Sequence, residues 1–121
     1  IKELKAIVNN YKLGRDKAIK NLSKIKKIKF LQPYGAFYFY LNIKNLEISS
    51  LKLVRKILND TGIALTPGID FDKKNGEDYI RMSFSNDHQT TKEASELLLN
   101  WFKKNYWLHH PWRFSIFLFF W

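Results

Sequence analysis

The sequence contains no cysteine, so it can form no disulfide, no thiolate metal site and no cysteine nucleophile. This absence is compatible with a reducing cytoplasm, where we expect the protein to be located. The motifs GxxxxGK[ST], GxGxxG, HExxH and GxSxG are also missing, and the five glycines are scattered singly. The sequence therefore lacks the common signatures of nucleotide binding, zinc-dependent hydrolysis and serine-hydrolase chemistry.

Acidic residues are scarce, since 11 Asp and Glu stand against 21 Lys and Arg and give a net charge of +10. Ten of the basic residues and only two acidic ones fall in residues 1–30. Aliphatic residues separate the lysines there, and few aromatic residues are present that could stack on bases. We interpret the region as a solvated lysine-rich helix face and expect no nucleic-acid partner. A basic module that binds membranes or nucleic acid is the alternative from a different functional class.

The last residues, 106–121, differ in composition from the rest of the chain. They contain three of the four tryptophans and no acidic residue. The apolar run 114–121 is about eight residues long, whereas a helix needs roughly twenty to cross a bilayer. We favour out-of-frame sequence added after a truncation, and the alternative is an interfacial anchor that touches a membrane. Adjacent residues such as His109 and His110 point apart in a strand, and no metal site is expected.

The first residue is Ile1 rather than Met, and the helical pattern has already begun there. We therefore expect that an upstream portion is missing from the sequence. The opening residues also lack the uninterrupted apolar core of a secretory signal.

Hydrophobic periodicity over residues 1–105 predicts an α+β domain with two layers, in which a short sheet packs on helices. Residues 106–121 are expected to lie outside this fold. The first expected element is one long helix, or two abutting helices, at 2–29, and a central strand covered on both faces follows at 36–43. The next helix is capped by Ser49 or Ser50 and ended by Gly62. Strands are then expected at 63–65 and 79–85, and a capping box at 90–93 opens the last helix.

Each predicted helix has an apolar stripe that we expect to face the core. The stripe residues are Leu4, Ile7, Val8, Tyr11, Ala18, Leu22 and Ile25 in the first helix, Leu51, Val54, Ile57 and Leu58 in the second, and Ala94, Leu97, Leu98, Trp101 and Phe102 in the last.

Arg81 is the candidate functional residue. Apolar and polar residues alternate from Tyr79 to Ser85, which places Arg81 on the polar face of a half-buried strand. Pro67-Gly68 predicts a rigid loop upstream, and Asn75-Gly76 a second turn. A guanidinium grips a carboxylate with two parallel hydrogen bonds, so an arginine in this setting suits recognition of a small acid. The alternative is a surface arginine that is paired with a nearby acid, Asp70, Asp72 or Asp78.

Read in order, PYGAFYFYLNI (33–43), GIALTPGIDFD (62–72) and YIRMSFS (79–85) resemble the C-terminal small domain of the class I and II pyridoxal-phosphate-dependent aminotransferases of fold type I. The resemblance covers about residues 1–105. It implies a mostly antiparallel sheet, and it implies that Arg81 binds the α-carboxylate of the substrate. Pro67, Gly68 and Phe71 match a PG-x-x-F turn that shapes the small domain, while Asp72 stands where many members have Gly.

The resemblance also implies what the chain does not contain. The Schiff-base lysine and the residues that hold pyridoxal 5'-phosphate lie upstream in the family's large domain, and no catalytic residue is assigned here. Lys24 follows a serine but lies among other lysines in a predicted helix, so we set it aside as a Schiff-base lysine. We expect a fragment that is inactive alone and does not bind the cofactor tightly.

In the intact family, the implied partners are an amino acid or 2-oxo acid substrate, the large domain and a second copy in a homodimer. The alternative to an inactive fragment is a chain that complements a separately encoded large domain without a covalent link.

Overall fold

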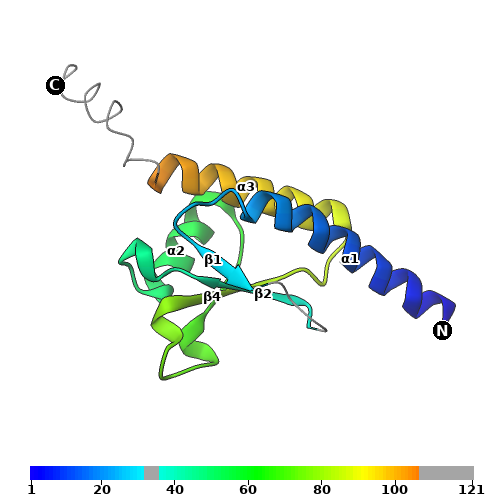
Figure 1. Cartoon of the computed structure of the whole chain (residues 1–121), viewed down its shortest axis with the longest axis horizontal. Helices are drawn as coiled ribbons and strands as arrows, with labels where there is room; N and C mark the ends of the chain where they lie inside the picture. Colours follow the sequence, from blue (N-terminus) through cyan, green and yellow to red (C-terminus); the bar gives the residue numbers. More distant parts are fainter. Residues whose placement is uncertain (32–35, 107–121) are drawn as a thin grey trace, which may run out of the picture.

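The structure is a computed structural model, and it describes residues 1–31 and 36–106. The elements in chain order are α1 (Lys2–Leu22), β1 (Lys29–Leu31), β2 (Tyr38–Asn42), the 3-10 helix η1 (Lys44–Leu46), α2 (Ser50–Thr61), β3 (Thr66–Pro67), the 3-10 helices η2 (Gly68–Asp70) and η3 (Gly76–Asp78), β4 (Tyr79–Ser83) and α3 (His88–Tyr106). The strands form an antiparallel four-stranded sheet in the order β1-β2-β4-β3. α1 and α3 lie side by side above this sheet (Figure 1), and the predicted α+β class is confirmed.

The helices cover one face of the sheet. Phe39 and Leu41 of β2 and their partners in β4 are buried against helix residues, which form one core with them. Tyr38 and Tyr40, on the other face of β2, are 37% and 41% exposed. The prediction that residues 36–43 are covered on both faces is therefore wrong. An antiparallel strand that packs on one side only shows this alternation of buried and exposed residues.

The segment after α1 is not helical, so the predicted helix over residues 2–29 is too long. α1 ends at Leu22, and a turn follows that brings Ile25 and Ile28 into the core, where they are 6% and 5% exposed. Residues 29–31 then pair with β2 as β1. The lysines of this region favour a helix, but burial of the two isoleucines and the ladder to β2 outweigh that weak local preference.

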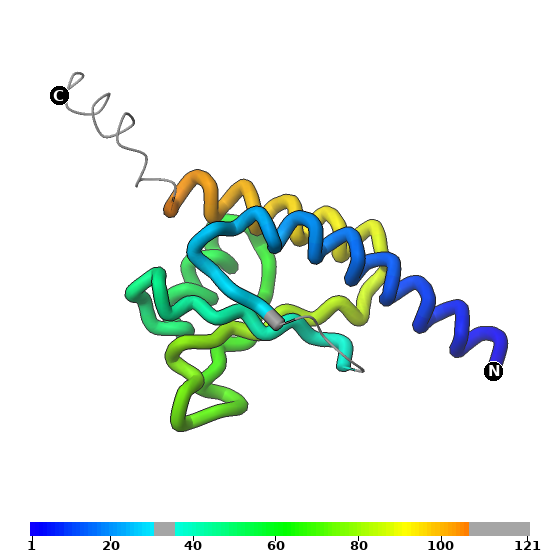
Figure 2. Tube along the Cα trace, viewed as in Figure 1, coloured from blue at the N-terminus to red at the C-terminus, as the bar shows by residue number. Residues whose placement is uncertain are grey.

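The N-terminal half of α1 extends past the beginning of α3 (Figure 2). Leu4 and Ile7 are consequently 64% and 48% exposed, whereas Ala18 and Leu22 further along the same helix are fully buried. The predicted stripe is therefore correct for the second half of α1 and wrong for Leu4 and Ile7. Two further stripe residues that were predicted to be buried, Leu58 and Leu97, are also exposed.

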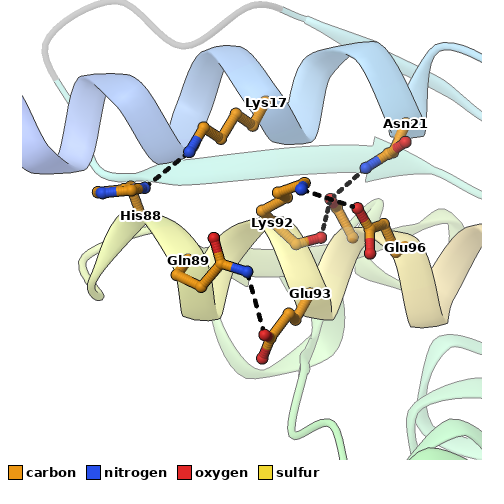
Figure 3. A network of polar contacts seen from close by, with 8 residues as sticks. Lys17, Asn21, His88, Gln89, Lys92, Glu93 and Glu96 are labelled. Atoms are coloured by element: carbon orange, nitrogen blue, oxygen red, sulfur yellow. Dashed lines mark hydrogen bonds and ion pairs between the residues drawn. The ribbon is translucent and has the colours of Figure 1, made fainter.

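Polar contacts join α1 to α3 along their shared length (Figure 3). Lys17 Nζ donates a hydrogen bond to His88 Nδ1 at 2.7 Å. One α1 turn later, Asn21 Nδ2 donates to Ser95 Oγ at 2.9 Å. Because residue numbers rise together along both helices at these contacts, α1 and α3 run parallel.

The ends of α2 follow the sequence prediction. Ser49 Oγ accepts a hydrogen bond from the N–H of Lys52 at 3.3 Å, and Gly62 has the left-handed φ of 79° that a helix C-terminus favours. The predicted strand at 63–65 is wrong, because pairing begins only at Thr66.

α3 starts three residues earlier than predicted, because its cap is Asp87 and not Thr90. The helix begins at His88, and Asp87 Oδ2 accepts hydrogen bonds from the N–H groups of Gln89 and Thr90 at 3.2 and 3.4 Å. Asp87 therefore caps the helix in place of the predicted capping box, as an aspartate at this position commonly does. The predicted break at 32–35, the tail beyond Tyr106 and the pair His109–His110 lie outside the described residues.

Candidate carboxylate-binding site

Arg81 lies in the middle of β4, opposite Tyr40 of β2 and Thr66 of β3. Its neighbours Ile80 and Met82 are buried in the core. Because side chains alternate along a strand, Arg81 stands on the sheet face that α1 and α3 leave uncovered. This is the polar-face position that the sequence predicted, and the side chain there is half-buried.

Two aromatic rings contact the guanidinium of Arg81. The guanidinium carbon lies 4.3 Å from the ring centroid of Tyr38 and 5.0 Å from that of Phe71. We call these two residues the aromatic clamp. Both distances fall within the range of about 6 Å in which a cation is attracted to the face of a ring. The rings come from different neighbours of β4, since Tyr38 is in β2 and Phe71 follows β3 and η2.

Arg81 forms no ion pair and no hydrogen bond within residues 1–31 and 36–106. Its Nε atom is buried and lacks a hydrogen-bond partner there. The predicted alternative, a pairing with Asp70, Asp72 or Asp78, is therefore not observed. Asp72 instead accepts hydrogen bonds from two N–H groups of the following turn through its Oδ1 atom, at 3.0 and 3.1 Å. The guanidinium thus has donors available for a ligand.

A close contact between two glycines fixes the loop that carries Phe71. A Cβ added at Gly68 would lie 2.2 Å from the carbonyl oxygen of Gly76 and 2.5 Å from that of Tyr79. Only residues without a Cβ allow the backbones of η2 and η3 to approach so closely. The N–H of Phe71 also donates to the carbonyl of Gly68 at 3.1 Å. The turn after Pro67 is therefore anchored to the residues that lead into β4.

The Phe71 ring is supported on the outer face of the sheet. Tyr40 meets Phe71 edge to face, with ring centroids 5.4 Å apart. Edge-to-face aromatic pairs stabilise by about 0.5–1.5 kcal/mol beyond their burial. The loop, β2 and β4 therefore meet at Arg81.

The sequence placed Arg81 correctly but did not find the clamp. Tyr38 was missed because the run 36–43 was interpreted as buried on both faces. The signal that could have revealed it is the alternation within that run, since Tyr38 and Tyr40 carry hydroxyls while Phe39 and Leu41 do not. Phe71 was matched as a turn residue, without its contact to Arg81.

Lys24 and the acidic residues offer no further site. Lys24 is exposed in the turn after α1, where water solvates its charge. In the part of the chain that the structure describes, no group of three or more His, Cys, Asp or Glu is placed to hold a metal ion. None of the helices in these ranges combines the length and the apolar character that a membrane crossing requires.

The chain is similar in sequence to aminotransferases. The chain is 33% identical over 92 residues to valine–pyruvate aminotransferase of Mycobacterium tuberculosis, a match that covers 76% of this chain and 24% of the relative. It is 32% identical over 89 residues to an aspartate aminotransferase of Sulfurisphaera tokodaii, covering 69% of this chain and 22% of the relative. The chain thus spans about a quarter of the length of the curated relatives that it matches. No protein-family model matches it.

Solved structures give the same result. An aminotransferase from Mycobacterium tuberculosis superposes with a TM-score of 0.78 at 30% identity, over 85% of this chain and 27% of the other. An aromatic aminotransferase from Pyrococcus horikoshii gives a TM-score of 0.76 at 27% identity, over 85% of this chain and 27% of the other.

Proposed function

This chain is related to the aminotransferases and has the fold of their small domain. We propose that it is the substrate-binding part of a pyridoxal-phosphate-dependent aminotransferase. In this proposal the intact enzyme moves an amino group between an amino acid and a 2-oxo acid. The small domain comprises the predicted residues 1–105 and also Tyr106, which was expected to lie outside the fold but ends α3 and packs against its core. Arg81 binds the α-carboxylate that both kinds of substrate share.

The observation that supports the proposal is that the guanidinium of Arg81, on the sheet face that α1 and α3 leave uncovered, has no polar partner among the described residues. A hydrogen bond to a charged group contributes about 1.5–3 kcal/mol, so an acid that reaches the terminal nitrogens of Arg81 would be held by a favourable interaction. A carboxylate offers two acceptor oxygens that match the guanidinium fork. Arg81 therefore orients an acid and contributes no proton transfer, because an arginine stays charged in proteins.

The described residues do not fit a site for the cofactor. Each lysine in these ranges is exposed or half-buried, so none has the desolvated pocket that makes a lysine nucleophilic at neutral pH. Pyridoxal phosphate supplies the electron sink of transamination when it is bound, and the protein supplies orientation. We therefore expect this chain alone to show no turnover. A stable pyridoxyl-lysine adduct at one site after borohydride reduction, together with transamination, would contradict this expectation.

Exposed apolar residues support a second candidate function, in which the chain completes a separately encoded large domain. Leu4 and Ile7 on α1 and Tyr38 and Tyr40 on β2 are all more than a third exposed. A partner that covers these residues would remove apolar surface from water, at about 25 cal/mol per Å². Co-expression with such a large domain should then restore transamination. No activity in the copurified pair would count against this candidate.

Carboxylate binding by the 121-residue chain tests the role of Arg81 directly. We expect acetate, at constant ionic strength, to shift the Arg81 side-chain resonance in NMR spectra with a Kd on the order of 10 mM, which corresponds to one charge-assisted pair. Arg81→Gln should abolish the binding. Arg55→Gln is the matched control, because Arg55 is exposed on α2 and has no part in the proposed site. Equal acetate binding by the Arg81→Gln variant and the wild type would refute the proposal.

A further inference from the structure

We propose that Tyr38 and Phe71, the aromatic clamp, are positioning residues that hold Arg81 ready for a carboxylate. The inference rests on the proposed function of Arg81 as a carboxylate-binding residue. It adds that the ring contacts set how well the guanidinium binds an acid. The two rings touch the guanidinium and need not touch the ligand.

The clamp takes the place that a polar partner would otherwise fill. A half-buried arginine is normally paired with a carboxylate or with carbonyl oxygens. Arg81 has no such partner in the described ranges, and its guanidinium carbon lies 4.3 Å from the Tyr38 ring and 5.0 Å from the Phe71 ring. Cation–π attraction to a ring face engages the charge of the guanidinium without accepting its in-plane N–H bonds. The rings therefore restrain Arg81 and leave its donors unpaired.

The burial of Nε determines from which side a ligand can reach the guanidinium of Arg81. Nε of Arg81 is buried, so a ligand that approaches from solvent does not reach this nitrogen. A carboxylate is therefore expected to bind end-on, through the two terminal nitrogens. Within residues 1–31 and 36–106 no acidic side chain forms an ion pair with Arg81, and the Oδ1 atom of Asp72 accepts hydrogen bonds from the N–H groups of its own turn.

Both members of the clamp are fixed by structure outside Arg81. Tyr38 belongs to the β2–β4 ladder, opposite Ser83. Phe71 is held by its N–H bond to the carbonyl of Gly68 and by the ring of Tyr40. Arg81, held between these two fixed rings, loses less conformational freedom when a ligand binds than a freely rotating arginine would. Removal of either ring should therefore weaken acetate binding by about two- to tenfold, the range that corresponds to one cation–π contact.

The test uses NMR of the full 121-residue chain, with sodium acetate as the probe and chloride to keep ionic strength constant. The variants are Tyr38→Leu and Phe71→Leu, and Tyr38→Phe should retain wild-type affinity because it keeps the ring. Tyr79→Leu is the matched control, since Tyr79 lies two residues before Arg81 on the same strand face and makes no ring contact with it in the described ranges. The readouts are the acetate Kd and the Arg81 Nε–Hε resonance in the absence of ligand.

The expected result is a weaker Kd and a displaced Nε–Hε resonance in both leucine variants, with neither change in Tyr79→Leu or Tyr38→Phe. A general loss of structure would move all resonances, and loss of the ring current alone would move the Arg81 resonance without changing the Kd. A weaker Kd together with a displacement confined to Arg81 therefore identifies positioning. A wild-type Kd in Tyr38→Leu would overturn the clamp while the proposed function stands. If Arg81→Gln binds acetate as the wild type does, the proposed function fails, and this inference fails with it. Tyr38 is exposed on β2, so its variant decides the test even if Phe71→Leu does not fold.

Discussion

Replacing Gly76 with alanine should destabilise the protein by forcing two backbone segments apart. The new Cβ would lie 2.3 Å from both the carbonyl carbon and the oxygen of Gly68, and 2.4 Å from the nitrogen of Ile69. Non-bonded carbon atoms prefer about 3.5–4.0 Å. Because all three contacts are with backbone, no side-chain rotation can relieve them. Overpacking costs about 1–3 kcal/mol, and we expect the upper end of this range here.

The size of the loss is large for a domain of this length. A domain of roughly 100 residues has a net stability of about 5–15 kcal/mol. A loss of about 3 kcal/mol corresponds to a fall in Tm of about 12–24 °C, since 1 kcal/mol shifts the Tm of such a domain by about 4–8 °C. Thermal unfolding followed by circular dichroism measures this shift.

Gly62→Ala is the control that separates backbone strain from steric conflict. Gly62 has a φ of 79°, but no atom lies within 4 Å of its added Cβ. This variant should cost only the left-handed penalty of about 1–2 kcal/mol. If Gly76→Ala melts no lower than Gly62→Ala, the contact between η2 and η3 is not as close as described.

Three further predictions concern the helices. Asp60→Ala should destabilise by about 1–2 kcal/mol in urea unfolding, because Trp101 Nε1 donates to Asp60 Oδ2 at 2.8 Å and joins α3 to α2; an unchanged midpoint would contradict that link. Ser49→Ala should lower the free energy of unfolding by about 0.5–1 kcal/mol, at the low end for a helix cap because the hydrogen bond from the N–H of Lys52 is 3.3 Å long. Ser49→Asp should restore the wild-type free energy in the same assay. Burial raises the pKa of Tyr106 above its usual 10.0. The stability that the neutral Tyr106 hydroxyl contributes is therefore fully present below pH 10 and is lost as pH rises through the folded-state pKa. Tyr106→Phe should therefore lose less stability than the wild type between pH 9 and pH 11, and parallel curves would count against the raised pKa.

Local chemistry determined the parts of the fold that the sequence predicted well. The alternation around Arg81 fixed which way the guanidinium points, because the side-chain period of a strand leaves only two choices. Ser49 and Gly62 marked the ends of α2, since a hydroxyl cap and a left-handed residue have specific uses there. These features depend on neighbours in the chain, so one sequence suffices to find them.

Features that depend on distant residues were missed. Residues 29–31 form β1 because β2 offers them a ladder, and their own sequence does not distinguish this from a helix. The exposure of Leu4 and Ile7 follows from where α3 begins, which periodicity within α1 cannot reveal. The clamp was missed for the same reason, since Tyr38 and Phe71 are 33 positions apart in the chain and only the fold brings them to Arg81.

The outermost strands of the sheet bear on how the protein behaves at high concentration. β3 consists of Thr66 and Pro67 alone, and proline has no N–H to offer to another chain. At the opposite edge, β1 is three residues long and begins with Lys29, a residue type that discourages edge-to-edge pairing. Neither edge is therefore a good template for a further strand, and growth of the sheet into fibrillar aggregates is disfavoured at both ends.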